Sequence, residues 1–388
     1  MRMPQRCAHV RMPEPSVGTR AIRDRLATVG TSPVTVALVL SFLVCAVIIL
    51  VTGVNPLSAY AEMWRGASSG SGPRTVIDRA VPIVGMALAI SIPFRTGIVN
   101  LGAEGQMIVG GLAAALTAIH LPGPGAFVIG VSFLAASAAG AAWALLPAIG
   151  QTALQLPILI SSLLLNAPAR ALTSYLVKYY FGDPTATSTT TVAVPEATRI
   201  PTLGWLSGAS ATAVPVLALV VAIALFNGRT APGYQSLVSG INLRFSRYGG
   251  VDVSRQTIVS MGVGGSIAGM VGAHLVLGQS GRFVDGDLAG SGFAWTGLLV
   301  CLIAANRAVP ILIAGSFFAA LQVGGLAMQR SAGVSWQLAQ VLQAIVILTL
   351  AMRVVPGMRR RGSSEPTPDL EADVIGQIAP GAADAVKV

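Results

Sequence analysis

Long apolar stretches separated by short polar segments run along most of the chain. The first apolar stretch, 34–54, is long enough as a helix to cross a hydrocarbon core of about 30 Å, at about 1.5 Å per residue. Nine further stretches follow it: 80–94, 104–119, 126–146, 157–176, 213–227, 257–278, 293–306, 308–328 and 336–353. The pattern predicts an all-α, polytopic membrane protein with about ten transmembrane helices.

Polar segments set the expected domain organisation. Residues 1–33 are basic and are expected to form an N-terminal tail, 34–355 the transmembrane domain, and 356–388 a disordered C-terminal tail. Residues 55–79 are predicted to be a polar loop, and 177–212 and 228–256 two longer loops. The loop 177–212 is rich in Thr and Ser, and both a solvated connector and a docking surface fit that composition. Residues 59–61 resemble a signal-peptide cleavage site, but the apolar run before them is longer than a typical signal core, which favours an uncleaved first span.

Composition supports a membrane protein and excludes most soluble classes. The chain is 53% hydrophobic and 10% charged with a mean hydropathy of +0.72, whereas soluble domains carry about 25% charged residues. The net charge of +10 has no accompanying aromatic and basic patch, so nucleic-acid binding is not expected. The three cysteines and three histidines are scattered, which predicts neither a metal site nor a disulfide framework, and no cofactor is expected.

The basic residues predict an orientation. With ten spans and the N-terminus inside, 17 Lys and Arg residues fall on the inner side and 8 on the outer side. Because basic residues concentrate in cytoplasmic segments, both termini are expected to be cytoplasmic.

One stretch, 94–111, breaks the otherwise apolar pattern. It contains Glu104, the one acidic residue inside the predicted spans, and glycines at 97, 102 and 105. A carboxylate in hydrocarbon costs about 3 kcal/mol or more unless it is paired or faces water, and each glycine costs about 1 kcal/mol inside a helix. Broken backbone at membrane depth is tolerated where it is packed in protein or lines a cavity. We therefore predict a broken segment near 95–106 that forms part of a pathway across the membrane.

The chain contains no signature of an energy-coupling or hydrolytic enzyme. No phosphate-binding Gly-x-x-x-x-Gly-Lys-Ser/Thr loop occurs, and neither Lys178 nor Lys387 follows a glycine-rich stretch. Transport would therefore draw energy from an ATPase partner or from an ion gradient.

Three segments carry a family resemblance. Residues 94–106, Phe-Arg-Thr-Gly-Ile-Val-Asn-Leu-Gly-Ala-Glu-Gly-Gln, closely resemble the motif of permease subunits of ABC importers for nucleosides and simple sugars, in the branched-chain amino acid and ribose permease superfamily. Residues 229–234, Arg-Thr-Ala-Pro-Gly-Tyr, resemble the segment that opens the cytoplasmic loop of that family, and Gly240-Ile-Asn242 follows. Residues 265–272 are a weaker, glycine-rich match. The chain departs from the family at Ala294, where an acidic residue is usual, and at Leu165-Asn166-Ala167, where the family has Leu-Asn-Tyr.

The resemblance implies a subunit of a heteromeric importer in the plasma (inner) membrane. Its implied partners are a second permease subunit, two ATP-binding subunits and an external solute-binding protein, with ATP hydrolysis on the partner chains. The loop 229–255 would contain the short coupling helix that meets the ATPase. Its expected residues are Arg229, Gly233, Tyr234, Gly240, Asn242, Arg244 and Arg247.

The pathway residues are expected from their type and position. Glu104 is expected to hydrogen-bond a hydroxylated solute or to pair with Arg95. Asn100 and Gln106 offer amide hydrogen bonds to solute or to neighbouring helices. Aromatic rings, which stack on a base or sugar or simply pack, complete the set: Phe94, Phe293 and Trp295. The scarcity of charge in the spans favours a neutral, polar solute.

Two other functions fit the residues. An ion-coupled secondary transporter would use Glu104 as its proton or cation site. A membrane scaffold would carry no solute at all.

Overall fold

The computed structural model describes residues 33–206, 208–333, 335, 337–338, 340–341 and 344–345. The two tails expected at 1–33 and 356–388 lie almost wholly outside these residues, as does most of the tenth expected span, 336–353. The chain divides into two units, Cys45–Gln343 and Met1–Val44 with Ala344–Val388. The described part of the second unit is chiefly the first half of one helix, and the following paragraphs concern the first unit.

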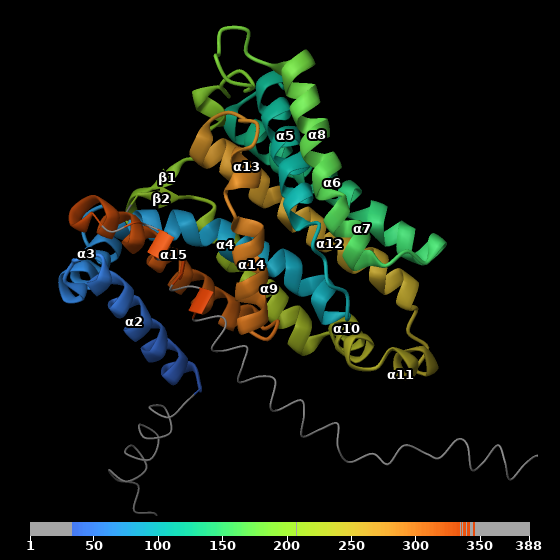
Figure 1. The fold of residues 1–388 in the computed structure, drawn as a ribbon. Coiled ribbons are helices and arrows are strands. Elements are labelled where there is room, and N and C mark those ends of the chain that lie inside the picture. The colour runs from blue at the N-terminus through green and yellow to red at the C-terminus, as the bar shows by residue number, and fades with distance from the viewer. Residues whose placement is uncertain are drawn as a thin grey trace, which may run out of the picture. The chain divides into compact units, whose positions relative to one another are not determined.

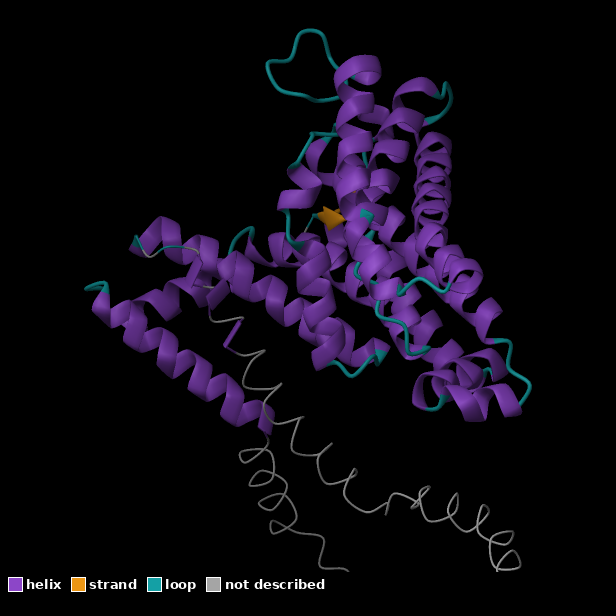
Figure 2. Cartoon of the chain, turned by 45° about the vertical axis from the view of Figure 1, so that its right-hand side comes forward, coloured by secondary structure: helices purple, strands orange, loops and turns teal. Residues whose placement is uncertain are grey.

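Helices make up most of the described chain (Figure 2). The α-helices are α2 (Pro33–Val51), α3 (Pro56–Ser68), α4 (Gly72–Arg95), α5 (Ala103–His120), α6 (Gly125–Leu154), α7 (Ile158–Leu164), α8 (Asn166–Leu176), α9 (Ala213–Arg229), α10 (Ala231–Ile241), α11 (Leu243–Tyr248), α12 (Val253–His274), α13 (Asp287–Gly290), α14 (Phe293–Ile303) and α15 (Ala308–Ala332). Two π-helical turns, η1 (Val177–Phe181) and η4 (Leu275–Ser280), extend α8 and α12. Two short 3₁₀ turns are η2 (Glu196–Thr198) and η3 (Gly204–Leu206). Strands β1 (Thr202–Leu203) and β2 (Ala209–Ser210) form one antiparallel pair with Thr202 opposite Ser210.

The centre of the unit is α12, which packs against α4, α5 and α6 (Figure 1). Small residues bring these backbones together. A Cβ added to Gly269 on α12 would lie 2.1 Å from the carbonyl oxygen of Ala136 on α6, and one added to Gly110 on α5 would lie 2.3 Å from the Cα of Gly269. Without water to drive association, membrane helices gain stability from this close packing. The glycine-rich run near 262–272 therefore brings the backbone of α12 close to those of its neighbours.

The segment 55–79 was expected to be a polar loop, and this prediction is wrong. Asn55 accepts a hydrogen bond from the backbone N–H of Leu57 and so caps α3, which has Pro56 at its first turn, an arrangement favoured at helix starts. Ala59 is buried with Ile49 and Met328 in a small apolar cluster. The helix is amphipathic, so its polar positions resemble those of a loop when only average hydropathy is considered.

Four helices are long and apolar enough to cross a membrane: α4, α6, α12 with η4, and α15. Two bent pairs, α2 with α3 and α9 with α10, raise the number to six at most among the described residues. The expected count of about ten is not confirmed by the described residues. The span expected at 157–176 is two helices that meet at Leu165, and that expected at 293–306 is α14, with 11 residues. At about 1.5 Å per residue, α14 covers roughly half of the hydrocarbon core.

The long connection after α8 is folded rather than extended. Thr190 pairs with Val284, and the backbone N–H groups of Val194 and Ile200 donate to Gly281 and Leu277. The N–H of Ser210 donates to the carboxylate of Asp78 on α4. This segment is therefore a cap that is tied to the end of α12 and to α4.

Candidate functional site

The helical structure is interrupted between α4 and α5, where the glycine pattern predicts a broken segment. We call this segment, 95–106, the break. Helix α4 ends at Arg95 and α5 begins at Ala103. Gly97 has a φ of +85°, a left-handed conformation that glycine adopts readily and other residues resist. Five further residues, 98–102, then lead into α5 without helical structure.

The side-chain amides of Asn100 and Gln106 hydrogen-bond to one another within the break. Both side chains are buried. The Asn100 amide donates to Oε1 of Gln106 at 3.1 Å, and its Oδ1 accepts from the backbone N–H of Gly102 at 3.0 Å. These bonds satisfy polar groups that would otherwise be unpaired inside the protein. In this conformation both amides are occupied in holding the broken segment.

Two further polar side chains, one on α7 and one on α8, hydrogen-bond to the backbone of the break. Asn166 on α8 donates to the carbonyl oxygen of Leu101 and accepts from the backbone N–H of Gly105, both at 2.9 Å. Ser162 on α7 accepts from the N–H of Leu101 at 3.2 Å. The first N–H groups of a helix have no partner within the helix, so Asn166 serves as a capping group for α5 that comes from another helix.

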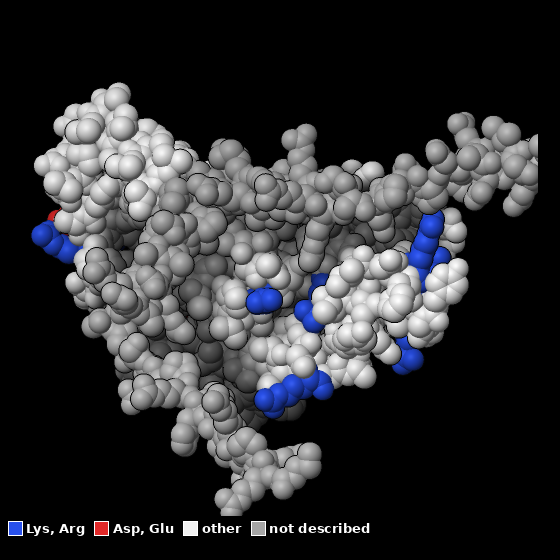
Figure 3. Space-filling view, turned by 90° about the horizontal axis from the view of Figure 1, so that it is seen from below, with Lys and Arg blue, Asp and Glu red and all other residues white. Residues whose placement is uncertain are grey.

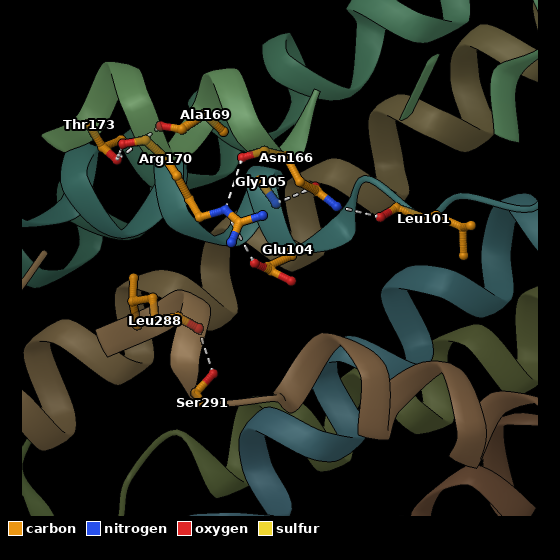
Figure 4. Close-up of polar contacts among 9 residues, drawn as sticks. All are labelled: Leu101, Glu104, Gly105, Asn166, Ala169, Arg170, Thr173, Leu288 and Ser291. Atoms are coloured by element: carbon orange, nitrogen blue, oxygen red, sulfur yellow. Dashed lines mark hydrogen bonds and ion pairs between the residues drawn. The ribbon is translucent and has the colours of Figure 1, made fainter. Parts of the chain in front are cut away.

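Glu104 points from the first turn of α5 toward Arg170 on α8 (Figure 4). The Nε of Arg170 lies 3.8 Å from Oε1 of Glu104. The carboxylate side chain is 9% exposed and that of Arg170 52% exposed. Glu104 was expected to pair with Arg95 or with solute, and its ionic partner here is Arg170. Arg95 instead donates to the carbonyl oxygen of Asn227 at the end of α9.

Glu104, Asn100 and Trp295 line one small cavity between the break and α14. Its volume is about 10 Å³, the space of about one water molecule. Trp295 is half exposed, so it has free surface on which a solute can stack. The other two aromatic candidates lie elsewhere. Phe94 is in the last turn of α4, outside this cavity, and buried Phe293 packs under the guanidinium of Arg79 at 5.9 Å.

The expected coupling loop contains two short helices, α10 and α11, at the lower end of the unit (Figure 1). Thr230 caps α10 through the N–H of Gly233, and Asn242 caps α11 through the N–H of Phe245. Gly233 is closely packed, because a Cβ there would lie 2.2 Å from the carbonyl oxygen of Phe226.

Gly240 connects this loop to the break. A Cβ at Gly240 would lie 2.3 Å from the carbonyl oxygen of Arg95, and one at Gly97 would lie 3.2 Å from the Cα of Gly240. The two backbones therefore touch at this point. The packing brings together the two sets of residues that the sequence singled out separately.

The outward side of α10 and α11 is apolar and basic. Large exposed side chains include Tyr234, Ile241 and Phe245, and the arginines at 229, 244 and 247 are also exposed. Figure 3 shows basic side chains on the described part of this face, with acidic atoms visible only at its far margin. Such a surface suits a partner with acidic and apolar groups.

Sequence reasoning missed Ser162, Asn166 and Arg170 as members of the site. They recur every four residues in an apolar stretch, a spacing that predicts a polar stripe on one face of a continuous helix, and that periodicity was the available signal. Within the described part of the chain, no three His, Cys, Asp or Glu side chains gather in an arrangement suited to a metal ion. The site offers amide, hydroxyl, indole and one paired carboxylate, which suits hydrogen bonding and stacking rather than bond-breaking chemistry.

Comparison of the sequence with known proteins identifies related chains. A family model described as branched-chain amino acid transport system / permease component matches residues 73–351. A glucose ABC transporter permease protein of Haloferax volcanii is 31% identical over 87% of this chain and 92% of its own length. A guanosine ABC transporter permease protein of Bacillus subtilis is 28% identical over 85% and 97%. A probable riboflavin import permease protein of Treponema pallidum is 26% identical over 81% and 84%.

Proposed function

The chain belongs to the family of branched-chain amino acid transport system permease components, and from this premise we propose that it is the membrane subunit of an ATP-driven importer of nucleosides or simple sugars. It is a multi-pass protein of the plasma membrane. The observation that carries the proposal is the family match over 73–351, which includes both the break and the loop at α10 and α11. The similarity to permeases named for guanosine and glucose supports a neutral, hydroxyl-rich solute.

The proposal includes a membrane topology. Ten spans with both termini in the cytoplasm place α10 and α11 on the inner side, in agreement with the excess of basic residues there. The short helices α5, α8 and α14 would complete the set together with 336–353. On this topology, 34–355 is the permease domain, flanked by cytoplasmic tails at 1–33 and 356–388.

ATP hydrolysis is assigned to separate chains. The sequence has no phosphate-binding loop, and the exposed apolar and basic surface of α10 and α11 supports the docking of an ATP-binding subunit. We propose an assembly of this chain with a second permease subunit, two ATP-binding subunits and an external solute-binding protein. Arg229, Arg244 and Arg247 would meet acidic groups of the ATPase.

The pathway residues have distinct proposed roles. Trp295 offers an indole face for a base or sugar ring, and Glu104 beside it offers a carboxylate for ring hydroxyls. Asn100 and Gln106 are engaged with one another in the present conformation and would turn to solute only when the break rearranges. Phe94 and Phe293 are assigned to packing.

The test is purification of the complex followed by transport in liposomes. We expect ATP-binding chains to co-purify and guanosine or glucose to enter only with ATP. Glu104→Gln keeps the side chain's size but leaves Arg170 without its ionic partner, so uptake should fall while assembly persists. Glu62→Gln on α3, whose partner Arg65 is exposed, is the matched control. Uptake at the wild-type rate in Glu104→Gln would remove the carboxylate from the mechanism.

A further inference from the structure

A large polar cavity lies directly beside the break, on the side of α10 and α11. Its volume is about 740 Å³, within the range of about 300–1,000 Å³ that is usual for small-molecule sites. Its wall includes Thr96 and Gly97 of the break and Gly240 of α10, so the coupling loop and the broken segment meet at its edge. The cavity beside Glu104 is far too small for a sugar, and a third cavity of about 600 Å³ is lined almost wholly by apolar side chains.

The lining is polar and nearly uncharged. Amide and hydroxyl side chains provide both donors and acceptors of hydrogen bonds, and they are Thr96, Gln151, Thr152, Gln155, Ser239, Ser254, Gln256 and Thr257. Among the described residues that line the cavity, Arg247 is the one charged side chain. A cationic solute would therefore find no counter-charge, whereas a neutral solute with several hydroxyl groups would find many partners.

Two features of α6 are ones that a ligand in this cavity would account for. The Oε1 of Gln151 is buried and has no hydrogen-bond partner among the described residues, although buried acceptors are nearly always paired. Gln155 ends α6 with a φ of 56°, a position at which glycine or asparagine is usual. Backbone strain of this kind gathers at ligand sites, and here it places a second glutamine at the cavity wall.

We propose that this cavity is a solute-release site, in which a nucleoside or hexose binds through Gln151 and the neighbouring amides before it enters the cytoplasm. The inference rests on the proposed function. The conformation described is then one in which the path beside Glu104 is closed and the inner cavity is open, and the contact between Gly97 and Gly240 forms the edge that separates them.

The first test replaces the unpaired acceptor. Gln151→Leu keeps the side chain's approximate volume and removes an oxygen that has no partner among the described residues. A merely structural role predicts unchanged or higher thermal stability and unchanged transport. The release-site role predicts that the half-saturating solute concentration rises by about 2- to 10-fold, the worth of one hydrogen bond, with ATP hydrolysis in the absence of solute unaffected. Gln329→Leu, on the exposed side of α15 outside the cavity, is the control.

The second test detects occupancy in the whole complex held in nanodiscs without ATP. Thr152→Cys lies in the cavity wall and Gln329→Cys, on the exposed side of α15, lies outside it. Both are made in a Cys7→Ser background, and the native Cys45 and Cys301 are buried. Guanosine or glucose, whichever the complex transports, should slow modification of the introduced thiol by 2-aminoethyl methanethiosulfonate in the Thr152→Cys variant only. Equal rates with and without solute, in a complex that still shows ATP-dependent uptake, would overturn the release site and leave the proposed function standing.

Two other results would also count against the site. Protection by inorganic phosphate but not by neutral solutes would assign the cavity to an anion through Arg247. A complex without ATP-dependent uptake of any solute would overturn the proposed function, and the release site with it.

Discussion

Asn166 is predicted to be the side chain on which the shape of the break depends most. Its amide supplies partners to two backbone groups of the break, the carbonyl oxygen of Leu101 and the N–H of Gly105. Asn166 is 4% exposed, so water does not readily substitute for it. Leaving a buried polar group unpaired costs about 1–3 kcal/mol. Asn166→Ala should therefore lower the free energy of unfolding by about 2–6 kcal/mol, since two groups are affected.

The neighbouring serines give a graded comparison. Ser162→Ala removes one bond to the break, from the N–H of Leu101, and should cost about 1–3 kcal/mol. The hydroxyl of Ser161 bonds to carbonyl oxygens of the first turn of α7 and the residue before it, so Ser161→Ala should change stability by less than about 0.5 kcal/mol. The two serines are adjacent and chemically identical, and only the hydroxyl of Ser162 bonds to the break.

The assay is equilibrium unfolding of the purified chain in mixed detergent micelles, followed by circular dichroism. Solute uptake by the reconstituted complex should decline in the same order, from Ser161→Ala through Ser162→Ala to Asn166→Ala. If Asn166→Ala unfolds within about 0.5 kcal/mol of wild type, the size expected of a surface substitution, then the break is held by something other than these bonds.

Two further predictions concern the loop at α10 and α11 and the cap formed by the connection after α8. Gly240→Ala should force α10 away from Arg95, at a cost of about 1–3 kcal/mol for overpacking, and should lower solute uptake per ATP hydrolysed. Gly228→Ala, which has open space around it, should leave that ratio unchanged, and equal ratios in both variants would refute a mechanical link. In the cap formed by the connection after α8, hydrogen bonds from the Thr185 side chain and backbone lower the pKa of the Asp183 carboxyl. A carboxyl pKa lowered by folding contributes stability above its unfolded value that is lost as the pH falls through the folded value. Thr185→Val should raise the Asp183 pKa in a carboxyl-carbon NMR titration, and an unmoved titration would show that the bond is absent.

The break was predictable from the sequence because it is marked by residues that are unusual at membrane depth, and Glu104 and Gly97 stand out against apolar neighbours. The loop 229–255 was identified by its resemblance to the family, and its role in coupling stays a prediction. Their contact was not predictable, because no periodicity links Gly97 to Gly240 across more than a hundred residues. It depends on how α10 folds back against the end of α4.

The burial of Glu104 was predicted correctly, but its ionic partner was not. Arg95 is close in sequence, but the end of α4 directs its guanidinium to α9. Arg170 reaches the carboxylate because α8 packs beside α5. The count of about ten spans stays a prediction, because apolar stretches of about 10–20 residues also form short helices such as α14, and hydropathy alone does not separate these from full crossings.

Uptake measured in proteoliposomes tests the central claim most directly. The complete complex, supplied with guanosine or glucose and its binding protein, should accumulate solute when ATP is enclosed on the side of α10 and α11. That accumulation should persist when proton and sodium gradients are collapsed, and this chain alone should carry nothing. Uptake by this chain alone that stops on collapse of a gradient and ignores ATP would contradict the account.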